Sequence, residues 1–363
     1  MGSQAQPGSD GRLTADGSRR RRVLVTGAAG FIGSHVAERL LRTGAEVLAI
    51  DNLDPMYDVG IKRTNLADLR REASQPGRGN FEFLEADLNR ADVVGPWLDA
   101  HRPGTIIHLA ARAGVRPSIL DPVGYCQSNI TATAALLSHA ARINCGRFVM
   151  ASSSSVYGNS EVVPFDEPRD VSDPVSPYAA TKKSCELLGS CHHHLTGMPT
   201  ACLRFFTVYG PRQRPDLAIQ SFMMKIARGE TLTVYGQGTS RDYTYIDDVV
   251  DGVLAACEAI PGHGFRIWNL GSDQPVVLDD MVRTIARVVG REARIERQPM
   301  QPGDVVRTWA DLRRAAAELN YRPKTPFAEG VKRQWEWNSR GGVDREGVSL
   351  ADGSPVVRGA RVT

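Results

Sequence analysis

Tyr178, Lys182 and a run of serines at positions 152–155 are side chains that could oxidise a bound alcohol. Tyr178 and Lys182 are four residues apart, which places both on one face of a helix. The lysine charge stabilises a phenolate over the neutral phenol, so the tyrosine could remove a hydroxyl proton near neutral pH. The serines could hold the alcohol that loses this proton. Alone, the pair could also be a solvent-facing helix turn, but the motifs around it favour chemistry.

A glycine-rich turn near the start of the chain predicts the hydride acceptor. Gly27, Gly30 and Gly33 follow a β-branched run, residues 22–26, and precede a helical pattern. This spacing permits a tight turn, close approach of the backbone to a pyrophosphate, and a helix N-terminus that faces the phosphates. Asp51 ends the next expected strand, where its carboxylate can accept from both ribose hydroxyls and would repel a 2′-phosphate. The sequence therefore predicts an NAD site rather than an NADP site.

Residues after two later strands could also contact the cofactor. Asp87 and Leu88 follow the third expected strand and could lie near the adenine, but the pair is equally typical of a helix N-cap. Leu109, Ala110 and Ala111 end the fourth strand, where small side chains would let the cofactor lie close. Ordinary core packing explains these three residues nearly as well.

Hydrophobic runs and helical patterns alternate along the first part of the chain. Strands are expected at residues 22–26, 46–50, 81–86, 105–110, 147–152 and 200–205. Helices are expected at residues 31–42, 61–72, 91–101, 122–142 and 176–196. Because parallel strands need crossover helices, this alternation predicts an α/β fold with a doubly wound parallel sheet.

The composition of the sequence changes after about residue 209, where Pro, Gly and Arg are more frequent and the expected strands are shorter. Strands are expected at residues 231–236, 241–246 and 265–270, and helices at 247–259, 278–289 and 311–319. We predict an NAD-binding domain at residues 21–209, to which later segments return, and a smaller, mainly substrate-binding α/β domain at 210–338. Polar, glycine-rich tails at 1–20 and 339–363 are expected to be disordered.

Bulk composition is that of an ordinary globular protein. The 363 residues are 42% apolar and 23% charged, and the formal net charge is +3. So small a charge gives no reason to expect nucleic-acid binding. No run approaches the roughly 18 apolar residues of a membrane span, and the first residues lack the apolar core of a secretory signal. We therefore expect a cytoplasmic protein without membrane contact.

Cysteine and histidine patterns predict neither disulfides nor a metal site. The six cysteines are scattered without paired spacing, which is typical of buried thiols in a reducing compartment. Residues 191–194 read Cys-His-His-His, which is similar to a metal-binding tract. On a helix, however, successive side chains point about 100° apart and cannot share one ion.

Several motifs in a fixed order resemble the extended short-chain dehydrogenase/reductases that act on sugar nucleotides. They are GAAGFIG, HLAARAGVR, SSSSVYG, YAATK and RFFTVYGPRQRPD, and the likeness runs from about residue 22 to 338. The resemblance implies that Tyr178 is the base, that Lys182 binds the nicotinamide ribose, and that the Ser153 hydroxyl bonds the reacting sugar oxygen. It also implies a larger set of NAD contacts. These are Gly27, Ala29, Gly30, Phe31, Ile32, Gly33, Asp51, Asn52, Leu53, Asp87, Leu88, Leu109, Ala110, Ala111, Asn129, Tyr178, Lys182, Phe205 and Val208.

Residues beside the catalytic serine separate the reactions of this family. By resemblance, dehydratases carry Asp-Glu at the positions of Ser154 and Ser155, and UDP-glucuronate decarboxylases carry Glu at that of Ser155. Neither serine can transfer a proton near neutral pH. What remains is oxidation at C4, reorientation of the ketone and return of the hydride to its other face, which is a 4-epimerase reaction.

Two motifs indicate which sugar is bound. RFFTVYGPRQRPD and DNLDPMYDVGIKR look like the corresponding motifs of the UDP-glucuronate 4-epimerases. UDP-glucose epimerases instead carry RFFNP where this chain has residues 204–208, Arg-Phe-Phe-Thr-Val. The hydroxyl of Thr207, with Ser154, Ser155 and Arg214, would suit a carboxylate at C6, although an ordinary strand-end threonine is the alternative. The expected substrate and product are therefore UDP-glucuronate and UDP-galacturonate.

The nucleotide half of the substrate is expected near the second half of the chain. The resemblance implies that Gln237, Arg241 and Asp304 surround uridine and the pyrophosphate, and Arg116 is either another anionic contact or a surface residue. The full expected substrate set is Arg116, Ser153, Ser154, Ser155, Tyr178, Thr207, Arg214, Gln237, Arg241 and Asp304. One departure is that Gln301 and Pro302 stand where galactose epimerases carry an arginine.

Other functions stay open from the sequence. One is a 4-epimerase of UDP-glucose or UDP-N-acetylglucosamine, another is a UDP-glucuronate decarboxylase, and a third is a dinucleotide-sensing module without catalysis. Such modules typically lose the tyrosine or the lysine, and this chain keeps both. The resemblance further implies a homodimer that forms through the helices expected at 122–142 and 176–196.

Overall fold

The computed structural model of the protein describes residues 21–300 and 303–340. The tail predicted at 1–20 and nearly all of the one predicted at 339–363 lie outside the described residues. Ser339 is instead the last residue of a helix, α12 (Phe327–Ser339).

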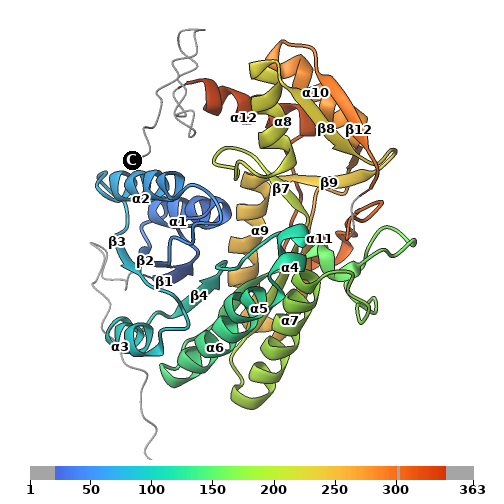
Figure 1. Cartoon of the computed structure of the whole chain (residues 1–363). Coiled ribbons are helices and arrows are strands. Elements are labelled where there is room, and N and C mark those ends of the chain that lie inside the picture. Colours follow the sequence, from blue (N-terminus) through green and yellow to red (C-terminus); the bar gives the residue numbers. More distant parts are fainter. Residues whose placement is uncertain (1–20, 301–302, 341–363) are drawn as a thin grey trace, which may run out of the picture.

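A seven-stranded parallel sheet forms the centre of the described chain (Figure 1). Its strands lie in the order β10 (Phe265–Leu270), β6 (Thr200–Phe205), β5 (Phe148–Ser153), β4 (Thr105–His108), β1 (Arg22–Thr26), β2 (Glu46–Asp51) and β3 (Phe81–Glu85). The strand order reverses between β1 and β4, which places a crevice at their carboxyl ends. The predicted doubly wound α/β fold is confirmed.

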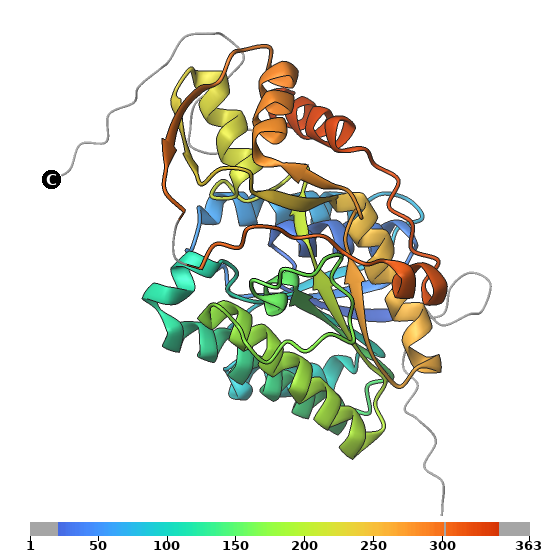
Figure 2. The same ribbon diagram turned by 90° about the vertical axis from the view of Figure 1, so that its right-hand side faces the viewer.

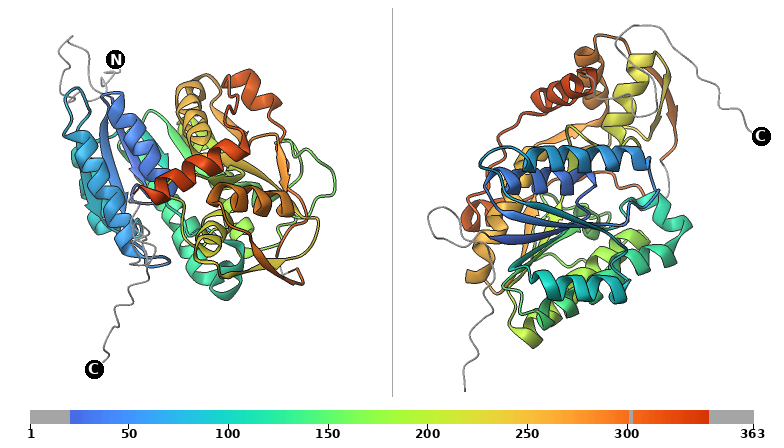
Figure 3. Two further views of the ribbon diagram at one scale, coloured as in Figure 1. Left: turned by 90° about the horizontal axis from the view of Figure 1, so that it is seen from above. Right: turned by 90° about the vertical axis from the view of Figure 1, so that its left-hand side faces the viewer.

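Helices cover both faces of this sheet, as the right-hand view of Figure 3 shows. One face packs against α1 (Phe31–Arg42), α2 (Val59–Ala73) and α9 (Ile246–Ala259). The other face packs against α3 (Ala91–His101), α6 (Ala132–Arg142) and α7 (Pro177–Thr196). Side chains along each strand alternate between the two cores, since Val23 and Val25 join the first cluster and Leu24 the second.

Smaller elements form the upper part of the molecule in Figures 1 and 2. A three-stranded sheet has the order β11 (Pro275–Val277), β9 (Ser240–Tyr245) and β7 (Thr207–Tyr209), and a two-stranded sheet pairs β12 (Arg294–Gln298) with β8 (Thr231–Tyr235). The helices here are α8 (Ala218–Arg228), α10 (Leu278–Val289) and α12, while α11 (Arg313–Glu318) packs against β10. Short 3₁₀ helices occur at Ser154–Tyr157 and Ile260–Gly262.

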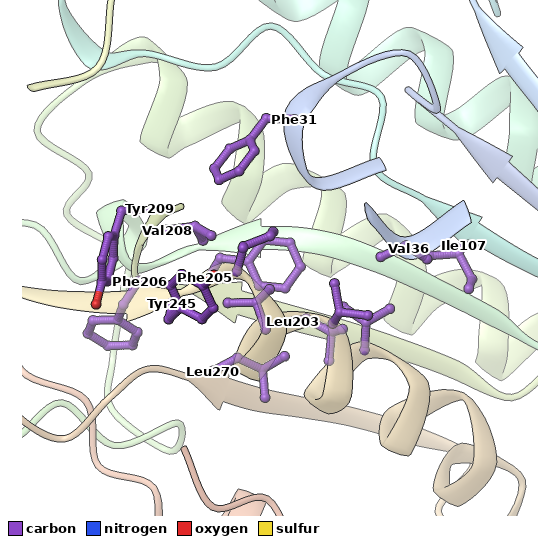
Figure 4. Packing of buried hydrophobic residues seen from close by; sticks show 14 of the residues in the cluster. Phe31, Val36, Ile107, Leu203, Phe205, Phe206, Val208, Tyr209, Tyr245 and Leu270 are labelled. Carbon is purple, nitrogen blue, oxygen red and sulfur yellow. The ribbon is translucent and has the colours of Figure 1, made fainter. Parts of the chain in front are cut away.

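One hydrophobic cluster joins the large sheet to the smaller one. Figure 4 shows Leu203 and Phe205 of β6 beside Val208 of β7 and Tyr245 of β9. Strand β10 lies in the large sheet although it follows α9 in the sequence, and β7 pairs with β9 although it directly follows β6. The division into two domains near residue 209 stays a prediction.

The helix predicted at 122–142 is confirmed in its bounds, because α5 (Pro122–Tyr125), a π-helix (Cys126–Thr131) and α6 follow one another without interruption. The π-helix inside it, and the short helix α4 (Val115–Leu120) that precedes it, were not predicted. The break between α4 and α5 has a local cause, because Asp121 is not helical (φ −135°, ψ 64°) and its carboxylate caps the next turn by accepting from the Gly124 amide at 2.9 Å. The π-helix depends on Asn129, whose side chain bonds to other parts of the fold.

Other boundaries differ less. The strand predicted at 105–110 ends at His108, which leaves residues 109–111 in an irregular segment, and the helix predicted at 311–319 covers only Arg313–Glu318. Helix α8 and strands β7, β11 and β12 were not predicted. Strand β12 reads Arg-Ile-Glu-Arg-Gln and is exposed throughout, so it lacks the hydrophobic pattern that identifies a strand.

Candidate active site

A cavity of about 470 Å³ lies at the carboxyl ends of the central strands. Most of the predicted site residues line it, although they come from points far apart in the sequence. Those from the cofactor set are Gly27, Gly30, Phe31, Ile32, Gly33, Asp51, Asn52, Asp87, Leu88, Leu109, Ala110, Ala111, Tyr178, Lys182, Phe205 and Val208. Those from the substrate set are Ser153, Ser154, Ser155, Tyr178, Thr207 and Arg214.

The turn between β1 and α1 has no room for a side chain at Gly27 or Gly33. Gly27 has a φ of +69°, and a Cβ there would lie 2.7 Å from the backbone nitrogen of Ala110. A Cβ on Gly33 would lie 2.1 Å from the Gly27 carbonyl oxygen, so α1 could not start so close to the strand. The turn therefore offers a bare backbone surface and the N-terminus of α1 to the cavity, a suitable place for phosphates.

Asp51 ends β2 beside this turn. Its carboxylate accepts hydrogen bonds from the Ala29 amide at 3.1 Å and the Leu53 amide at 2.8 Å. The Lys62 ammonium lies 3.8 Å away, and both side chains are buried. Burial raises the pKa of Asp51, while Lys62 and the two amides act in the opposite direction. Ala29 and Leu53, which were expected to contact the cofactor, do not line the cavity. Their backbone amides instead hold the Asp51 carboxylate, which does line it.

The expected catalytic side chains converge on the same cavity. Helix α7 begins at Pro177, and Ser176 caps it by accepting from the Ala179 amide at 3.1 Å. Tyr178 and Lys182 lie on its cavity side, and the Lys182 ammonium donates to the Ala151 carbonyl at 2.9 Å. Within the described part of the chain, no hydrogen bond joins the Tyr178 hydroxyl to Ser153 or Lys182. An oxygen of a bound substrate could bridge the hydroxyls of Tyr178 and Ser153.

Three consecutive serines form the part of the cavity wall beside α7. Ser153 ends β5, and its hydroxyl oxygen accepts from the Ser155 amide at 3.2 Å and from the Ser155 hydroxyl at 3.0 Å. Ser154 and Ser155 begin the short 3₁₀ helix and face the cavity. The Ser155 hydroxyl thus supports the oxygen of Ser153, and Ser154 remains available to a bound group.

Asn129 was expected beside the cofactor but does not line the cavity. Its side-chain oxygen accepts from the Arg112 amide at 2.8 Å, and its amide nitrogen donates to the Arg112 carbonyl and the Thr181 hydroxyl, both at 3.0 Å. The residue therefore links the segment after β4 to helix α7. These bonds explain the π-helix, since the extra residue in the turn directs Asn129 inward.

A second group of expected substrate residues lies beside the cavity rather than in it. The Arg116 guanidinium pairs with Asp304 at 2.7 Å and stacks 4.7 Å from the centre of the Tyr235 ring. Arg241 donates to the carbonyls of Ser240 and Val306, at 3.0 and 3.2 Å. We call Arg116, Tyr235, Arg241 and Asp304 the basic cluster.

The basic cluster adjoins the cavity through the chain neighbours of its members. Val115 lines the cavity and directly precedes Arg116, and a Cβ on Gly303 would lie 2.9 Å from the Val115 side chain. Burial lowers the pKa of Arg241, and the nearby Asp304 only partly offsets this. A bound anion would therefore stabilise the guanidinium. Gln237 is exposed in the turn after β8, and residues 301 and 302 lie outside the described chain.

Sequence reasoning missed a set of residues that close the cavity. Tyr57 lies between two cations, with Lys62 4.9 Å and Arg214 5.5 Å from its ring centre. Arg112 pairs with Asp54 at 3.1 Å and also lines the cavity. Asp54, Tyr57 and Lys62 fall within the motif DNLDPMYDVGIKR, but that motif does not indicate which of its side chains face inward.

A family model described as GDP-mannose 4,6 dehydratase matches residues 24–334. The chain belongs to this family. The match covers the glycine turn, Asp51, the serine run and the Tyr178–Lys182 pair in one unit. The predicted membership of the extended, sugar-nucleotide group of short-chain dehydrogenase/reductases is confirmed.

Individual relatives are similar over almost their entire length. The UDP-glucuronate 4-epimerase of Thermodesulfobacterium geofontis is 39% identical, and the alignment covers 87% of this chain and 95% of that protein. The Bacillus cereus UDP-glucuronic acid 4-epimerase, solved with UDP-glucuronic acid and NAD, has a TM-score of 0.80 at 33% identity and covers 88% of this chain and 99% of its own. A Thermotoga maritima UDP-glucose 4-epimerase, solved with UDP-glucose, has a TM-score of 0.78 at 28% identity over 88% and 99% of the two chains.

Proposed function

We propose that the chain is an NAD-dependent 4-epimerase that interconverts UDP-glucuronate and UDP-galacturonate. The named relatives support this, because similarity to UDP-glucuronate 4-epimerases extends over 95% or more of their length. One observation in the site carries the proposal. Tyr178, Lys182 and Ser153 line a single cavity in which two further serines, 154 and 155, stand in place of an additional acid or base.

The residues around β1 and β2 fit NAD. The bare turn at Gly27 and Gly30 can receive the pyrophosphate, and the buried Asp51 carboxylate can accept from the adenosine ribose. Leu109 and Ala110, across the turn, leave space for a flat ring system. When bound, NAD supplies the acceptor and later the donor of the C4 hydride.

Each catalytic side chain has one task in this proposal. Tyr178 accepts the proton of the C4 hydroxyl when the hydride leaves, and it returns the proton after the keto sugar has turned over. Lys182, held beside Tyr178 by the Ala151 carbonyl, supplies positive charge and a donor for the nicotinamide ribose. Ser153 donates a hydrogen bond to the sugar oxygen whose charge changes.

Polar groups at the sugar end suit a C6 carboxylate. Thr207, Ser154 and Ser155 bring hydroxyls to the cavity, and Arg214 lies there with its guanidinium paired to Asp216 at 2.7 Å. A 4-keto uronate is a β-keto acid, which loses carbon dioxide when its carboxylate is desolvated and aligned. Hydroxyl donors would keep that carboxylate hydrogen-bonded and thereby favour epimerisation over decarboxylation.

The basic cluster is the proposed site of the UDP group. Arg241 can bind two phosphate oxygens with its planar fork, and burial without a strong carboxylate partner leaves it suited to an anion. Arg116, Asp304 and Gln237 would surround the uridine or the pyrophosphate. Val115 lines the cavity and Arg116 of the basic cluster directly follows it in the chain, so one extended ligand can reach both the cavity and the basic cluster.

The remaining expectations are part of the same proposal. All six cysteines are free thiols and four of them are buried, which supports a cytoplasmic, reducing location. In the described chain no helix has the length and apolarity needed to cross a bilayer. A homodimer is proposed through the helical segment 122–142, which includes α5 and α6, and through α7, against which α4 packs. Residues 21–209 are proposed to serve mainly NAD, and residues 210–338 mainly the UDP-sugar.

Product analysis with UDP-glucuronate tests the function directly. We expect UDP-galacturonate, identified by unchanged mass and by inverted stereochemistry at C4 in the NMR spectrum. Release of carbon dioxide with a UDP-pentose as the main product would establish a decarboxylase instead. Comparable turnover of UDP-galactose would contradict the specificity for a uronate.

A Thr207→Val variant tests the carboxylate site at nearly constant side-chain volume. Without this hydroxyl, we expect a several-fold larger fraction of UDP-pentose among the products, because the carboxylate is less firmly bonded. Thr231→Val is a matched control, since Thr231 is exposed at the start of β8, away from the cavity. An unchanged product ratio in Thr207→Val would remove Thr207 from the carboxylate site.

A further inference from the structure

A buried ion pair lies behind the catalytic helix and takes no part in the chemistry described above. The Glu186 carboxylate accepts from Arg204 Nε at 2.7 Å and from Arg204 Nη2 at 2.9 Å, and both side chains are 1% exposed. Glu186 belongs to α7 and Arg204 to β6. A buried pair is weak evidence for stability, because desolvation opposes the attraction, so its placement needs another explanation.

The pair connects to the serine wall of the cavity. The Ser152 hydroxyl donates to the Glu186 carboxylate at 2.7 Å, so one side chain binds the ends of both β5 and β6. In the sheet, Ser152 is the register partner of Arg204, and Ser153 is the register partner of Phe205. Glu186 therefore holds the residues directly before the expected catalytic serine and before a residue that lines the cofactor cavity.

The same pair also holds the far end of the serine segment. The Arg204 guanidinium stacks 4.8 Å from the centre of the Tyr157 ring, and the Tyr157 hydroxyl donates to Asn269 at 2.7 Å. Residues 153–156 thus lie between two fixed points, Ser152 and Tyr157. The first point bonds to Glu186 and the second stacks on Arg204, so the buried pair contacts both.

Helix spacing brings the base into this arrangement. Tyr178, Lys182 and Glu186 are successive residues four apart on α7, and all three belong to one face of the helix. Lys182 and Glu186 contact consecutive residues of β5, the Ala151 carbonyl and the Ser152 hydroxyl. If Lys182 turns to the nicotinamide ribose during catalysis, Glu186 is the anchor that stays.

Helix α7 also packs closely against β5 at Gly189, in the turn after Glu186. A Cβ on Gly189 would lie 2.4 Å from the Met150 side chain, so α7 lies directly on β5. Burial alone would raise the pKa of Glu186, but the hydrogen bonds from Arg204 outweigh it and lower the pKa. The carboxylate is therefore ionised near neutral pH. A second cation, the Lys183 ammonium, lies 3.5 Å from the Glu186 carboxylate, and its side chain is 28% exposed.

We propose that Glu186 is a positioning residue that sets the separation of Tyr178 and Ser153 by tying α7 to the ends of β5 and β6. This rests on the proposed function, in which both hydroxyls must reach the same sugar oxygen. A carboxylate suits the task because it accepts several hydrogen bonds from directions fixed by two strands. Displacement of a reacting group by about 1 Å can cost about 100-fold in rate.

Two substitutions and their combination test the proposal. Glu186→Gln keeps the side-chain shape, and Ser152→Ala cuts only the link to β5 while it leaves the buried pair intact. We expect each to lower kcat about tenfold or more, with a nearly unchanged KM and NAD content. A substrate with deuterium at C4 should show a larger isotope effect on kcat, because hydride transfer becomes slower than the other steps.

The double variant separates positioning from independent contacts. If Glu186 acts through Ser152, the double variant should be no slower than Glu186→Gln alone, whereas a direct contact of Ser152 with ligand would make the two losses multiply. Lys183→Met is the matched control, since it removes a partner of Glu186 that does not reach the strands. We expect it to keep wild-type kcat.

The outcomes are distinct. An unchanged kcat and an unchanged isotope effect in Ser152→Ala would overturn the proposal. Losses in kcat that multiply in the double variant would overturn it too. Should Glu186→Gln fail to fold, Ser152→Ala alone is the deciding test. Equal losses in Lys183→Met would show a general charge effect and would also overturn it. Wild-type protein that does not epimerise UDP-glucuronate would instead refute the proposed function.

Discussion

The hydroxyl oxygen of Tyr178 is the single atom on which the proposed chemistry depends most. Tyr178→Phe removes it and leaves the ring, which packs edge-on against Tyr125 with centroids 6.3 Å apart. We expect turnover of UDP-glucuronate to fall by about two orders of magnitude or more, since a general base is lost. Bound NAD, measured after gel filtration, should stay at the wild-type level. A variant with normal turnover would exclude Tyr178 as the base, and a sensing module would show no difference in any assay.

We expect one residue, Asp51, to decide the choice between NAD and NADP. Asp51→Asn removes the charge that would repel a 2′-phosphate, while Lys62, 3.8 Å from the carboxylate, stays in place. We expect the ratio of NAD to NADP affinity to fall at least tenfold, as measured by titration calorimetry. Glu85→Gln is a matched control, because Glu85 is the register partner of Asp51 on β3 but is exposed and does not line the cavity. Unaltered preference in Asp51→Asn would assign the selectivity to other residues.

The sequence identifies residues of this kind well when their role follows from a local pattern. Gly27 and Tyr178 are examples, because a tight turn and a helix face are each set by a few neighbouring residues. Lys62 and Arg112 were missed because their partners, Asp51 and Asp54, are reached only after the chain has folded. Of the basic cluster, Arg241 and Asp304 were predicted by resemblance, and Tyr235 was not predicted. Nothing in the local pattern of Arg116 indicates its contact with Asp304.

At the scale of elements, the strands were predicted more accurately than the segment between β4 and β5. Buried parallel strands are continuous apolar runs, so their positions are visible in the sequence. The helix predicted at 122–142 has the right bounds, but the π-helix within it was not predicted. It lies around Asn129, whose partners are the Arg112 backbone and Thr181. Such a turn is stabilised by tertiary contacts and has no periodic signature of its own.

A buried histidine at the end of β4 gives this region a predicted pH response. His108 contacts the Thr26 hydroxyl at 2.7 Å and the Thr133 hydroxyl at 2.9 Å. The Thr133 hydroxyl donates to the Asn129 carbonyl, so it accepts from His108 Nε2, and Nδ1 accepts from Thr26. Burial, followed by the nearby Lys182 charge, lowers the pKa of His108 from 6.5 to about 3.

The sign of the effect follows from this lowered pKa. Between pH 6.5 and about 3 the unfolded chain binds a proton at His108 that the folded chain does not, so stability falls as the pH falls. In His108→Asn we expect the slope of unfolding free energy against pH to be shallower by up to about 1.4 kcal/mol per pH unit in this window. Urea unfolding at several pH values measures it. His194→Asn, a change at an exposed residue near the end of α7, should keep the wild-type slope, and equal slopes in all three proteins would contradict the prediction.

At the scale of the whole molecule, one surface carries an unusual set of apolar side chains. Leu120 of α4 is 88% exposed, Val123 of α5 is 65% exposed and Leu187 of α7 is 59% exposed. The three helices pack against each other, so these residues belong to one side of the molecule. An apolar surface formed by α7 and the helices packed against it is what the proposed homodimer would bury.

The oligomeric state can be tested on this surface without touching the cavity. We expect the wild-type protein to sediment at twice the mass of one chain. The double variant Leu120→Glu, Leu187→Glu should sediment as a monomer, because a twofold interface would bury each introduced carboxylate on both subunits. Val162→Glu is the matched control, since Val162 is 68% exposed in the segment before Pro164 rather than on these helices. Dissociation should also lower kcat, because α7 carries both the exposed Leu187 and Tyr178, the proposed base. A wild-type monomer at micromolar concentration, or a dimer that survives both glutamates, would place the interface elsewhere or remove it.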